Sequence, residues 1–193
     1  MADEITLIRR SRERDERAFE QLVLLKREKA FRIALNILGN EEDARDVAQT
    51  GFIRLWSAIG GFDENAAFDP WFSRIVVNLA IDFLRRRRRM PRALEQPIED
   101  ATAGLPADVQ PGADAEAMRS ELRRIFNRLA VKLSPAQRAV FTLKEIEGMG
   151  TEEIAGLLEI SQSTVRNHLM QARRILQEGL RRRYPEYFRG PGK

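Results

Sequence analysis

The chain has 193 residues, which is enough for one domain of ordinary size or for two small ones. Hydrophobic residues make up 43% of it and charged residues 32%, a balance that indicates a packed, soluble protein rather than a disordered one. With no cysteine and a single histidine, His168, the sequence excludes a disulfide framework, a zinc–thiolate site and a histidine metal site. We therefore expect no metal and no cofactor.

The charge is distributed unevenly along the chain. Residues 1–90 carry a net charge of +2, residues 91–119 of −4 and residues 120–193 of +6. Two basic blocks flanking an acidic connector favour a polyanionic partner, because Lys and Arg gain affinity for phosphates by releasing counterions. The N-terminus is charged where a signal peptide needs an apolar stretch, and no apolar run could span a bilayer. The expected location is cytoplasmic, with no membrane insertion.

The N-terminal block is predicted to be helical. Apolar residues recur at helical spacing over residues 18–38, and Gly39 ends that helix. Acidic residues 41–43 begin the next helix, where they suit the positive end of the helix dipole, and Gly60 breaks it. A last helix then completes this block.

That last helix follows a loop. Residues 62–70 are predicted to form the loop, and the helix begins at Pro70, just ahead of Trp71. It ends in a run of five arginines, residues 85–89, and Pro91 stops it. The arginines favour a grip on nucleic-acid phosphates, although a basic, solvated helix end is the alternative.

A connector separates the two blocks. Residues 91–117 hold four prolines and two glycines and have little periodic apolar content, which is the composition of a linker. We predict an all-α protein of two small helical domains, residues 1–90 and 118–193, joined by this flexible acidic linker.

The C-terminal block is sharply punctuated. A helix is expected over residues 114–131. Ser134 then caps a helix with Pro135 at its first position, Gln137 completes a capping box, and that helix runs to about Ile146. Residues 147–150 form a turn.

Residues 151–174 have helix-turn-helix architecture. Thr151 caps a short helix, Glu159-Ile160 forms a tight turn, and Ser161 caps a long final helix. A plain helical hairpin with a solvated face is the alternative. Binding to DNA is favoured because residues 160–177 contain no acidic residue, and Arg, Asn and Gln can bond bidentately to base edges.

Two stretches resemble the extracytoplasmic-function (ECF) group of the sigma-70 family, promoter-recognition subunits of bacterial RNA polymerase. The stretch LSPAQRAVFTLKEIEGMGTEEIAGLLEISQSTVRNHLMQARRIL resembles the domain that binds the promoter −35 element. The stretch from LVLLKREKAFRIALNILGNEEDARDVAQTGFIRLWSAIGGF to FDPWFSRIVVNLAIDFLRRRRR resembles the matching −10 domain. Both stand in the family's order, with its linker between them.

The resemblance implies a sigma factor that is not an enzyme, recognises the −35 and −10 elements and promotes DNA melting. Its implied partners are promoter DNA, an anti-sigma factor, and core RNA polymerase through the clamp of the largest subunit and the flap of the second-largest. The polymerase-binding residues are implied to be Asp43, Asp46, Gln49 and Arg54. From the residues alone, these would be an ordinary charged helix face.

The resemblance also implies two sets of DNA-binding residues. The −10 set surrounds a pocket for a base flipped out of the duplex, where stacking and hydrogen bonds offset the cost of unstacking. It comprises Phe62, Trp71, Arg74, Asn78, Asp82, Arg85 and Arg86, although Trp71 could also be a core residue. The −35 set comprises Ser163, Thr164, Arg166, Asn167, Met170, Gln171, Arg173 and Arg174.

Three positions depart from the family pattern. Thr50-Gly51 follows Gln49 where glutamate is usual, and a glycine predicts a weak point at which the helix can bend. Glu159 stands where the turn often carries glycine, so a different turn is expected. Gln171 stands where arginine is frequent, which shifts the expected base preference from guanine toward adenine.

Two other classes of protein compete with this interpretation. A sigma-like decoy would sequester an anti-sigma factor, but such decoys are joined to a receiver domain. A simple helix-turn-helix activator or repressor would leave the N-terminal block without a role. The linker either threads through the polymerase as an imitation of nucleic acid or acts as a plain tether.

Overall fold

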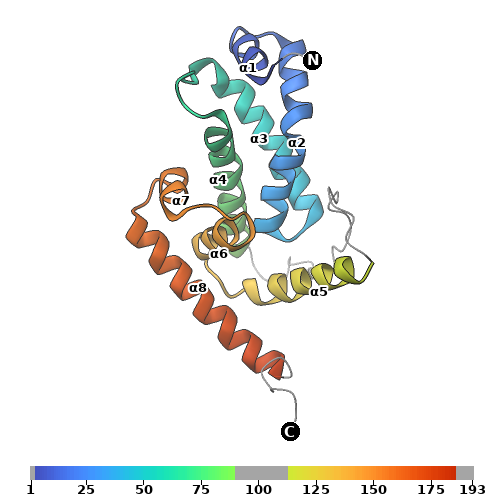
Figure 1. The fold of residues 1–193 in the computed structure, drawn as a ribbon, viewed down its shortest axis with the longest axis vertical. Helices are drawn as coiled ribbons and strands as arrows, with labels where there is room; N and C mark the ends of the chain where they lie inside the picture. Colours follow the sequence, from blue (N-terminus) through green and yellow to red (C-terminus); the bar gives the residue numbers. More distant parts are fainter. Residues whose placement is uncertain (1–2, 90–112, 186–193) are drawn as a thin grey trace. The chain divides into compact units, whose positions relative to one another are not determined.

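The computed structural model describes residues 3–89 and 113–185, all of whose regular elements are helices (Figure 1). The chain divides into two compact units, Met1–Glu95 and Gln96–Lys193. The predicted all-α class is therefore confirmed. Of the predicted linker, residues 91–112 lie outside the described residues, whereas its last part belongs to the first helix of the second unit.

The first unit consists of four α-helices and a 3₁₀ turn: α1 (Glu4–Arg12), α2 (Glu16–Leu38), α3 (Glu41–Ala58), η1 (Ile59–Gly61) and α4 (Phe68–Arg89). Helices α2, α3 and α4 pack against one another in pairs, and α1 packs on α2 and η1 (Figure 1). Their shared core includes the fully buried side chains of Leu22, Ile33, Leu55, Phe72 and Val76. This core holds the predicted −10 and polymerase-binding residues on one scaffold.

The ends of these helices follow their local chemistry. The Asp15 carboxylate caps α2 by accepting a hydrogen bond from Ala18 N at 3.1 Å, and the Asn40 side chain caps α3 by accepting from Asp43 N at 2.9 Å. Gly39 lies between α2 and α3 in the left-handed region, with φ of 71°, where a side chain would be strained. The predicted break at Gly39 is thus confirmed.

Two predictions for the first unit need correction. Helix α1 had not been expected, because its charged sequence hides the two buried apolar residues, Leu7 and Ile8, that attach it to the core. Helix α4 begins at Phe68, not at Pro70. A proline within the first turn is tolerated, since no intrahelical bond needs its N–H there.

The second unit consists of α5 (Ala113–Ala130), α6 (Pro135–Phe141), the π-helical segment η3 (Thr142–Ile146), α7 (Thr151–Leu158) and α8 (Gln162–Arg183). Helix α8 packs against α5, α6 and α7. The buried side chains of this unit include Leu133, Val140, Leu143, Ile154 and Val165. The long final helix is therefore fixed by three others, which leaves one of its faces in solvent.

The capping signals of this unit were mostly correct. Ser134 and Gln137 form the predicted reciprocal capping box, and Ser161 caps α8 by accepting from Thr164 N at 3.1 Å. For α7 the N-cap is Gly150 rather than Thr151, and the Glu153 carboxylate accepts from Gly150 N at 3.3 Å. The helix from Pro135 changes to π-helical geometry at Thr142, where Glu147 N donates to Thr142 O across five residues.

Candidate nucleic-acid interface

Helices α7 and α8 are joined by the tight turn of a helix-turn-helix. Glu159 ends α7 in the left-handed conformation, with φ of 56°, and Ile160 N donates to Ala155 O at 3.0 Å. The different turn expected for a non-glycine residue is therefore not observed. A left-handed residue other than glycine costs about 1–2 kcal/mol, so this turn carries that strain at Glu159.

The exposed face of α8 carries the predicted −35 residues. Val165, Leu169, Ala172 and Leu176 are buried against the rest of the unit, so the opposite side of the helix is open. Arg166 and Asn167 are exposed there, and Met170 keeps 63% of its surface in solvent. Long polar side chains beside an exposed methionine suit contact with base edges and thymine methyl groups.

The first turn of α8 is a hydroxyl cluster. The Ser161 hydroxyl lies 2.7 Å from that of Ser163 and 2.8 Å from that of Thr164. Ser163 is exposed and Thr164 is half-buried. Hydroxyls at the N-terminus of a helix suit phosphate oxygens, because the helix dipole is positive there.

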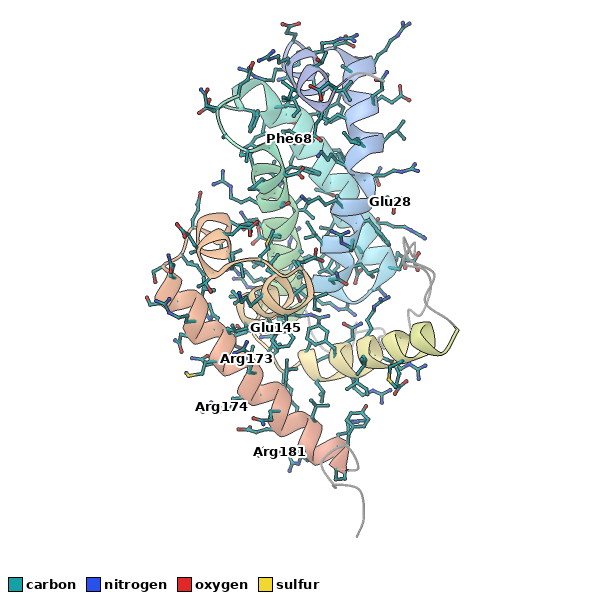
Figure 2. The ribbon with its side chains drawn as sticks, viewed as in Figure 1. Glu28, Phe68, Glu145, Arg173, Arg174 and Arg181 are labelled. Atoms are coloured by element: carbon teal, nitrogen blue, oxygen red, sulfur yellow. The ribbon has the colours of Figure 1, made fainter. Side chains whose placement is uncertain are left out.

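Two predicted −35 residues have partners on other helical segments of the second unit. Arg173 donates to the Glu145 carboxylate of η3 at 2.6 Å (Figure 2). Gln171 is half-buried, and its carbonyl oxygen accepts a hydrogen bond from Gln137 of α6 at 2.7 Å. Sequence reasoning missed both partners, because each comes from another helix. Arg174 stays 73% exposed and lies 4.0 Å from the Glu178 carboxylate.

In the first unit, an aromatic cluster lies between η1 and the first turns of α4. The Phe62 ring is 4% exposed and packs edge-on against Phe68, with ring centroids 5.4 Å apart. The half-buried Trp71 ring lies 4.8 Å from that of Phe62. Phe62 is thus a core residue that supports Trp71. Trp71 is thus partly a core residue, and its role toward DNA stays a prediction.

One side of α4 carries the other predicted −10 residues. Asn78 is exposed, and Arg74 and Asp82 are half-buried one turn before and after it. The Asp82 carboxylate pairs with Arg85 at 3.2 Å. The spacing i, i+4, i+8 places Arg74, Asn78 and Asp82 along one helix face, as expected.

The arginines of residues 85–89 lie in different environments. Arg85 and Arg86 are exposed, whereas Arg87 is half-buried and pairs with Asp43 of α3. The five arginines therefore do not form a uniform basic surface, and Arg87 links two helices.

The predicted polymerase-binding residues lie along α3. Asp46, Gln49 and Arg54 are exposed, while Asp43 is half-buried beside Arg87. Burial raises the pKa of Asp43, and the acidic neighbours Glu42 and Asp46 add to this, while Arg87 acts in the opposite direction. Asp43 is thus a less accessible contact than the other three.

Gly51 has a packing role that the sequence did not reveal. Helix α3 continues through it from Glu41 to Ala58, and Gly51 itself is buried against α4. A Cβ atom at this position would lie 3.3 Å from Val76 Cγ2. Glycine therefore permits the close approach of α3 to α4. This packing, and not a bend in the helix, explains why glycine stands at position 51.

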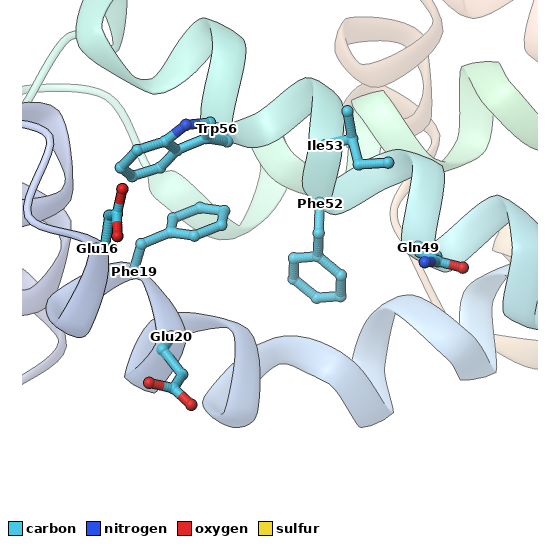
Figure 3. Close-up of a pocket in the computed structure, with 7 residues that line it drawn as sticks. All are labelled: Glu16, Phe19, Glu20, Gln49, Phe52, Ile53 and Trp56. Carbon is cyan, nitrogen blue, oxygen red and sulfur yellow. The ribbon is translucent and has the colours of Figure 1, made fainter.

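An apolar groove of about 390 Å³ runs between α2 and α3 (Figure 3). Phe19 and Trp56 pack together at one end, with ring centroids 4.7 Å apart. Ile53, whose side chain is among those lining the groove, is 62% exposed. The remaining lining residues are Glu16, Glu20, Gln49 and Phe52. The sequence suggested only a charged helix face here, because residues of α2 complete the groove.

Among the described residues, no group of three or more His, Asp or Glu side chains could hold a metal ion. Within the same residues, no helix is both long and apolar enough to cross a membrane. The arrangement that remains is two exposed polar helix faces, on α4 and α8, and an apolar groove beside α3.

Known proteins share both units. Residues 22–90 match the family model of sigma-70 region 2, and residues 121–176 match that of sigma-70 region 4. The ECF RNA polymerase sigma factor SigW of Bacillus subtilis is 32% identical over 179 residues, covering 90% of this chain and 95% of that protein.

Solved structures show the same fold. The structure of CnrH in complex with the cytosolic domain of CnrY has a TM-score of 0.61 at 27% identity, covering 94% of this chain and 99% of that chain. The sigma factor RpoE of Bartonella quintana, solved with the anti-sigma factor NepR, also has a TM-score of 0.61, covering 84% of this chain and 96% of that one. At 21% identity, that second likeness concerns the fold alone.

Proposed function

Because the chain belongs to the extracytoplasmic-function group of sigma-70 factors, which act in transcription initiation, we propose that it binds core RNA polymerase and opens promoters from two DNA elements. The observation that carries the proposal is that one chain has both an open polar face on α8 and an open polar face on α4. A simple repressor would need only the first.

The second unit recognises the −35 element in duplex DNA. Helix α8 enters the major groove, where Arg166, Asn167 and Met170 reach base edges. The hydroxyls of Ser163 and Thr164 contact phosphates at its N-terminus. Arg174 adds a phosphate contact further along the helix, and its exposure supports this assignment.

The first unit captures the melted −10 element. Trp71 offers a partly exposed ring for stacking, and Asn78 offers an amide that can both donate and accept hydrogen bonds. Arg85 and Arg86 hold the phosphates of the displaced strand. Unstacking one base costs a few kcal/mol, which stacking and hydrogen bonding in such a site offset.

Core polymerase binds along α3, and we assign the clamp of its largest subunit to this face. Asp46, Gln49 and Arg54 supply polar contacts, and the adjoining groove with Ile53 supplies an apolar one. An apolar pocket edged by polar side chains is the usual composition of a protein interface. The flap of the second-largest subunit binds the second unit.

An anti-sigma factor is the third partner. The RpoE structure contains an anti-sigma factor and the CnrH structure contains CnrY, and both have the fold of this chain. Such a partner would hold the protein inactive until a signal releases it.

Run-off transcription tests the proposal. The full chain is added to core polymerase with a library of genomic promoter fragments, and core polymerase alone is the control. We expect discrete transcripts that appear only with the protein and depend on both elements. If no transcript appears and the protein instead relieves inhibition of another sigma factor, it is a decoy for an anti-sigma factor.

A further inference from the structure

A chain of hydrogen bonds connects the beginning of α6 to the DNA-facing side of α8. The Ser134 backbone N–H donates to Gln137 Oε1 at 2.8 Å, and Gln137 Nε2 donates to Gln171 Oε1 at 2.7 Å. Gln171 Nε2 then donates to Asn167 Oδ1 at 3.1 Å. We call these three side chains, Gln137, Gln171 and Asn167, the amide relay.

The direction of the relay is fixed by its first bond. A backbone N–H can only donate, so the atom of Gln137 that faces Ser134 must be its oxygen. The nitrogen of Gln137 therefore faces Gln171, which must present its own oxygen in return. By the same reasoning Gln171 presents its nitrogen to Asn167, and Asn167 is left with its Nδ2 group at the end of the relay.

We propose that Gln137 is a positioning residue that sets the base preference of α8 by fixing the orientation of these amides. This inference rests on the proposed −35 role of α8 and adds to it. In each of Gln171 and Asn167 the oxygen is directed at a donor from the protein, while amide hydrogens remain for DNA. Arg166, on the same exposed face, is also only a donor.

A face rich in donors selects bases that present acceptors. Guanine offers O6 and N7 in the major groove, whereas cytosine offers the N4 donor and adenine pairs its N7 acceptor with the N6 donor. A freely rotating Gln171 would suit adenine, because it could accept from N6 and donate to N7 at once. The relay removes that freedom, so Asn167 and Gln171 select guanine over adenine and cytosine.

The test changes the direction of the relay without removing the helix cap. Glutamate is the other residue that completes a capping box after serine, so Gln137→Glu keeps the bond from Ser134 N. Its second carboxylate oxygen can only accept, and therefore Gln171 must turn its nitrogen toward residue 137. Asn167 then donates to Gln171 Oε1 and shows its own oxygen to DNA.

Holoenzymes are compared on promoters randomised across the −35 element, with base preference read from sequenced transcripts. For wild type we expect guanine to be favoured over adenine by about tenfold at the base pair that faces Asn167. In Gln137→Glu this preference reverses toward adenine and cytosine. Gln137→Met, which breaks the relay and leaves Gln171 free, flattens the preference.

Gln177→Glu is the matched control, because it adds the same charge at an exposed position of α8 outside the relay. An added charge alone weakens transcription evenly over the library and leaves the preference as in wild type. If Gln137→Glu behaves as this control does, the relay proposal is wrong while the −35 role stands. If wild type shows no −35 preference at all, the proposed function of α8 fails together with the relay.

Thermal unfolding of each variant accompanies the transcripts. If Gln137→Glu proves to be unfolded, Gln171→Met replaces it, since it removes the middle of the relay and leaves the cap intact, and its effect is read at the base pair that faces Asn167 and not at the one that faces Gln171. It must then flatten the preference as Gln137→Met does, and a preference equal to that of wild type would overturn the proposal.

Discussion

Arg87 Nη1 donates to the Asp43 carboxylate over 2.9 Å, joining the last turn of α4 to the first turn of α3. The Asp43 side chain is 23% exposed and the Arg87 side chain is 32% exposed, so the pair is partly shielded from solvent. One end of this pair belongs to the arginine run and the other to the proposed polymerase-binding face. This ion pair therefore adds to the packing of α3 on α4 that holds the two proposed surfaces of the first unit together.

We predict that Arg87→Ala destabilises the first unit, whereas Arg86→Ala does not. The loss is about 1 kcal/mol, since the pair is partly screened by solvent. Fluorescence of Trp56 and Trp71 monitors urea unfolding of this unit, because both tryptophans lie in it. Arg86→Ala should instead weaken DNA binding evenly and reduce its salt dependence. Equal effects of both substitutions on stability would contradict the assignment of Arg87.

The same variant has an expected pH dependence. Burial already raises the pKa of Asp43 in the wild type, and loss of Arg87 raises this pKa further. A carboxyl whose pKa is raised in the folded state lowers the free energy of unfolding as the pH rises through that pKa. At pH values below its pKa in the unfolded state it has no such effect. The defect of Arg87→Ala should therefore be largest at neutral pH and disappear in acid, and Asp43→Asn should relieve it.

A second group of charges should make the first unit sensitive to acid. Lys26 is 6% exposed and pairs with Asp69 at 2.7 Å and with Glu4 at 2.8 Å. Burial works against ionisation of Asp69, but hydrogen bonds and charge from Lys26 and Lys29 outweigh it and lower the pKa of Asp69. A carboxyl whose pKa is lower in the folded state than in the unfolded state stabilises the protein at pH values above the unfolded-state pKa. That stabilisation is lost as the pH falls through the folded-state pKa.

Asp69→Asn should accordingly cost about 1 kcal/mol at pH 7, after allowance for the solvent exposure of this carboxylate. Below the pKa of the folded wild type, the two proteins should have equal free energies of unfolding. Urea titrations at neutral and strongly acidic pH check this. A difference that persists unchanged in acid would mean that the aspartate acts through shape and not through charge.

Asn78→Ala should separate binding from opening. Asn78 is exposed, so its removal should leave stability within about 0.5 kcal/mol of wild type. We expect a loss of promoter opening, measured by permanganate reactivity of unpaired thymines, that exceeds any loss of binding to closed duplex DNA. Equal losses of opening and binding would rule out a role in capturing a flipped base.

Arg166→Ala and Arg173→Ala should affect the −35 element differently. Arg166 is exposed and proposed to read bases, so its loss should relax discrimination at one base pair by about 1–3 kcal/mol. Arg173 neutralises Glu145, so its loss leaves that carboxylate uncompensated beside the DNA-facing helix and should weaken binding evenly over all sequences. Binding to a set of singly substituted −35 duplexes measures both. An even loss for Arg166→Ala would make Arg166 a phosphate contact instead.

Glycine-to-alanine substitutions at two helical positions should give different results. Alanine is favoured over glycine in a helix by about 1 kcal/mol. At Gly156, where a Cβ meets nothing within 4 Å, this gain should appear in full. At Gly51 the new Cβ presses on Val76, which is fully buried, so we expect no gain for alanine and clear destabilisation for leucine.

Far-UV circular dichroism and tryptophan fluorescence measure these changes in the second and first units. Truncating Val76 to alanine makes room for the added Cβ, so the double variant should be more stable than the sum of the two single changes predicts. The packing explanation would be contradicted if the changes in the free energy of unfolding were simply additive. It would also be contradicted if alanine stabilised the protein as much at Gly51 as at Gly156.

The sequence could predict most helix boundaries, because they depend on local chemistry. Ser134, Ser161 and Gly39 end or begin helices through bonds to residues only a few positions away. Helix α1 escaped prediction because only two of its apolar residues reach the core, too few to show a period. The π-helical segment escaped because no residue type is specific to that geometry.

The proposed contact residues were predictable as exposed polar positions, but their pairings were not. The partners of Asp43, Gln171 and Arg173 lie between 28 and 44 positions away in the chain. Such distances are bridged by helix packing, which single-sequence patterns do not encode. The groove beside α3 was missed for the same reason, since two helices line it.

The π-helical geometry of η3 has a consequence for insertions and deletions. Glu145 lies inside this segment, where the hydrogen bonds span one residue more than in an α-helix. Deleting one residue there would restore α-helical bonding and turn the neighbouring side chains by about 100° around the axis. Glu145 would then leave Arg173, and a guanidinium now neutralised within the protein would be released to bind phosphate. The basicity of α8 is therefore set by the length of the chain before it as well as by its own residues.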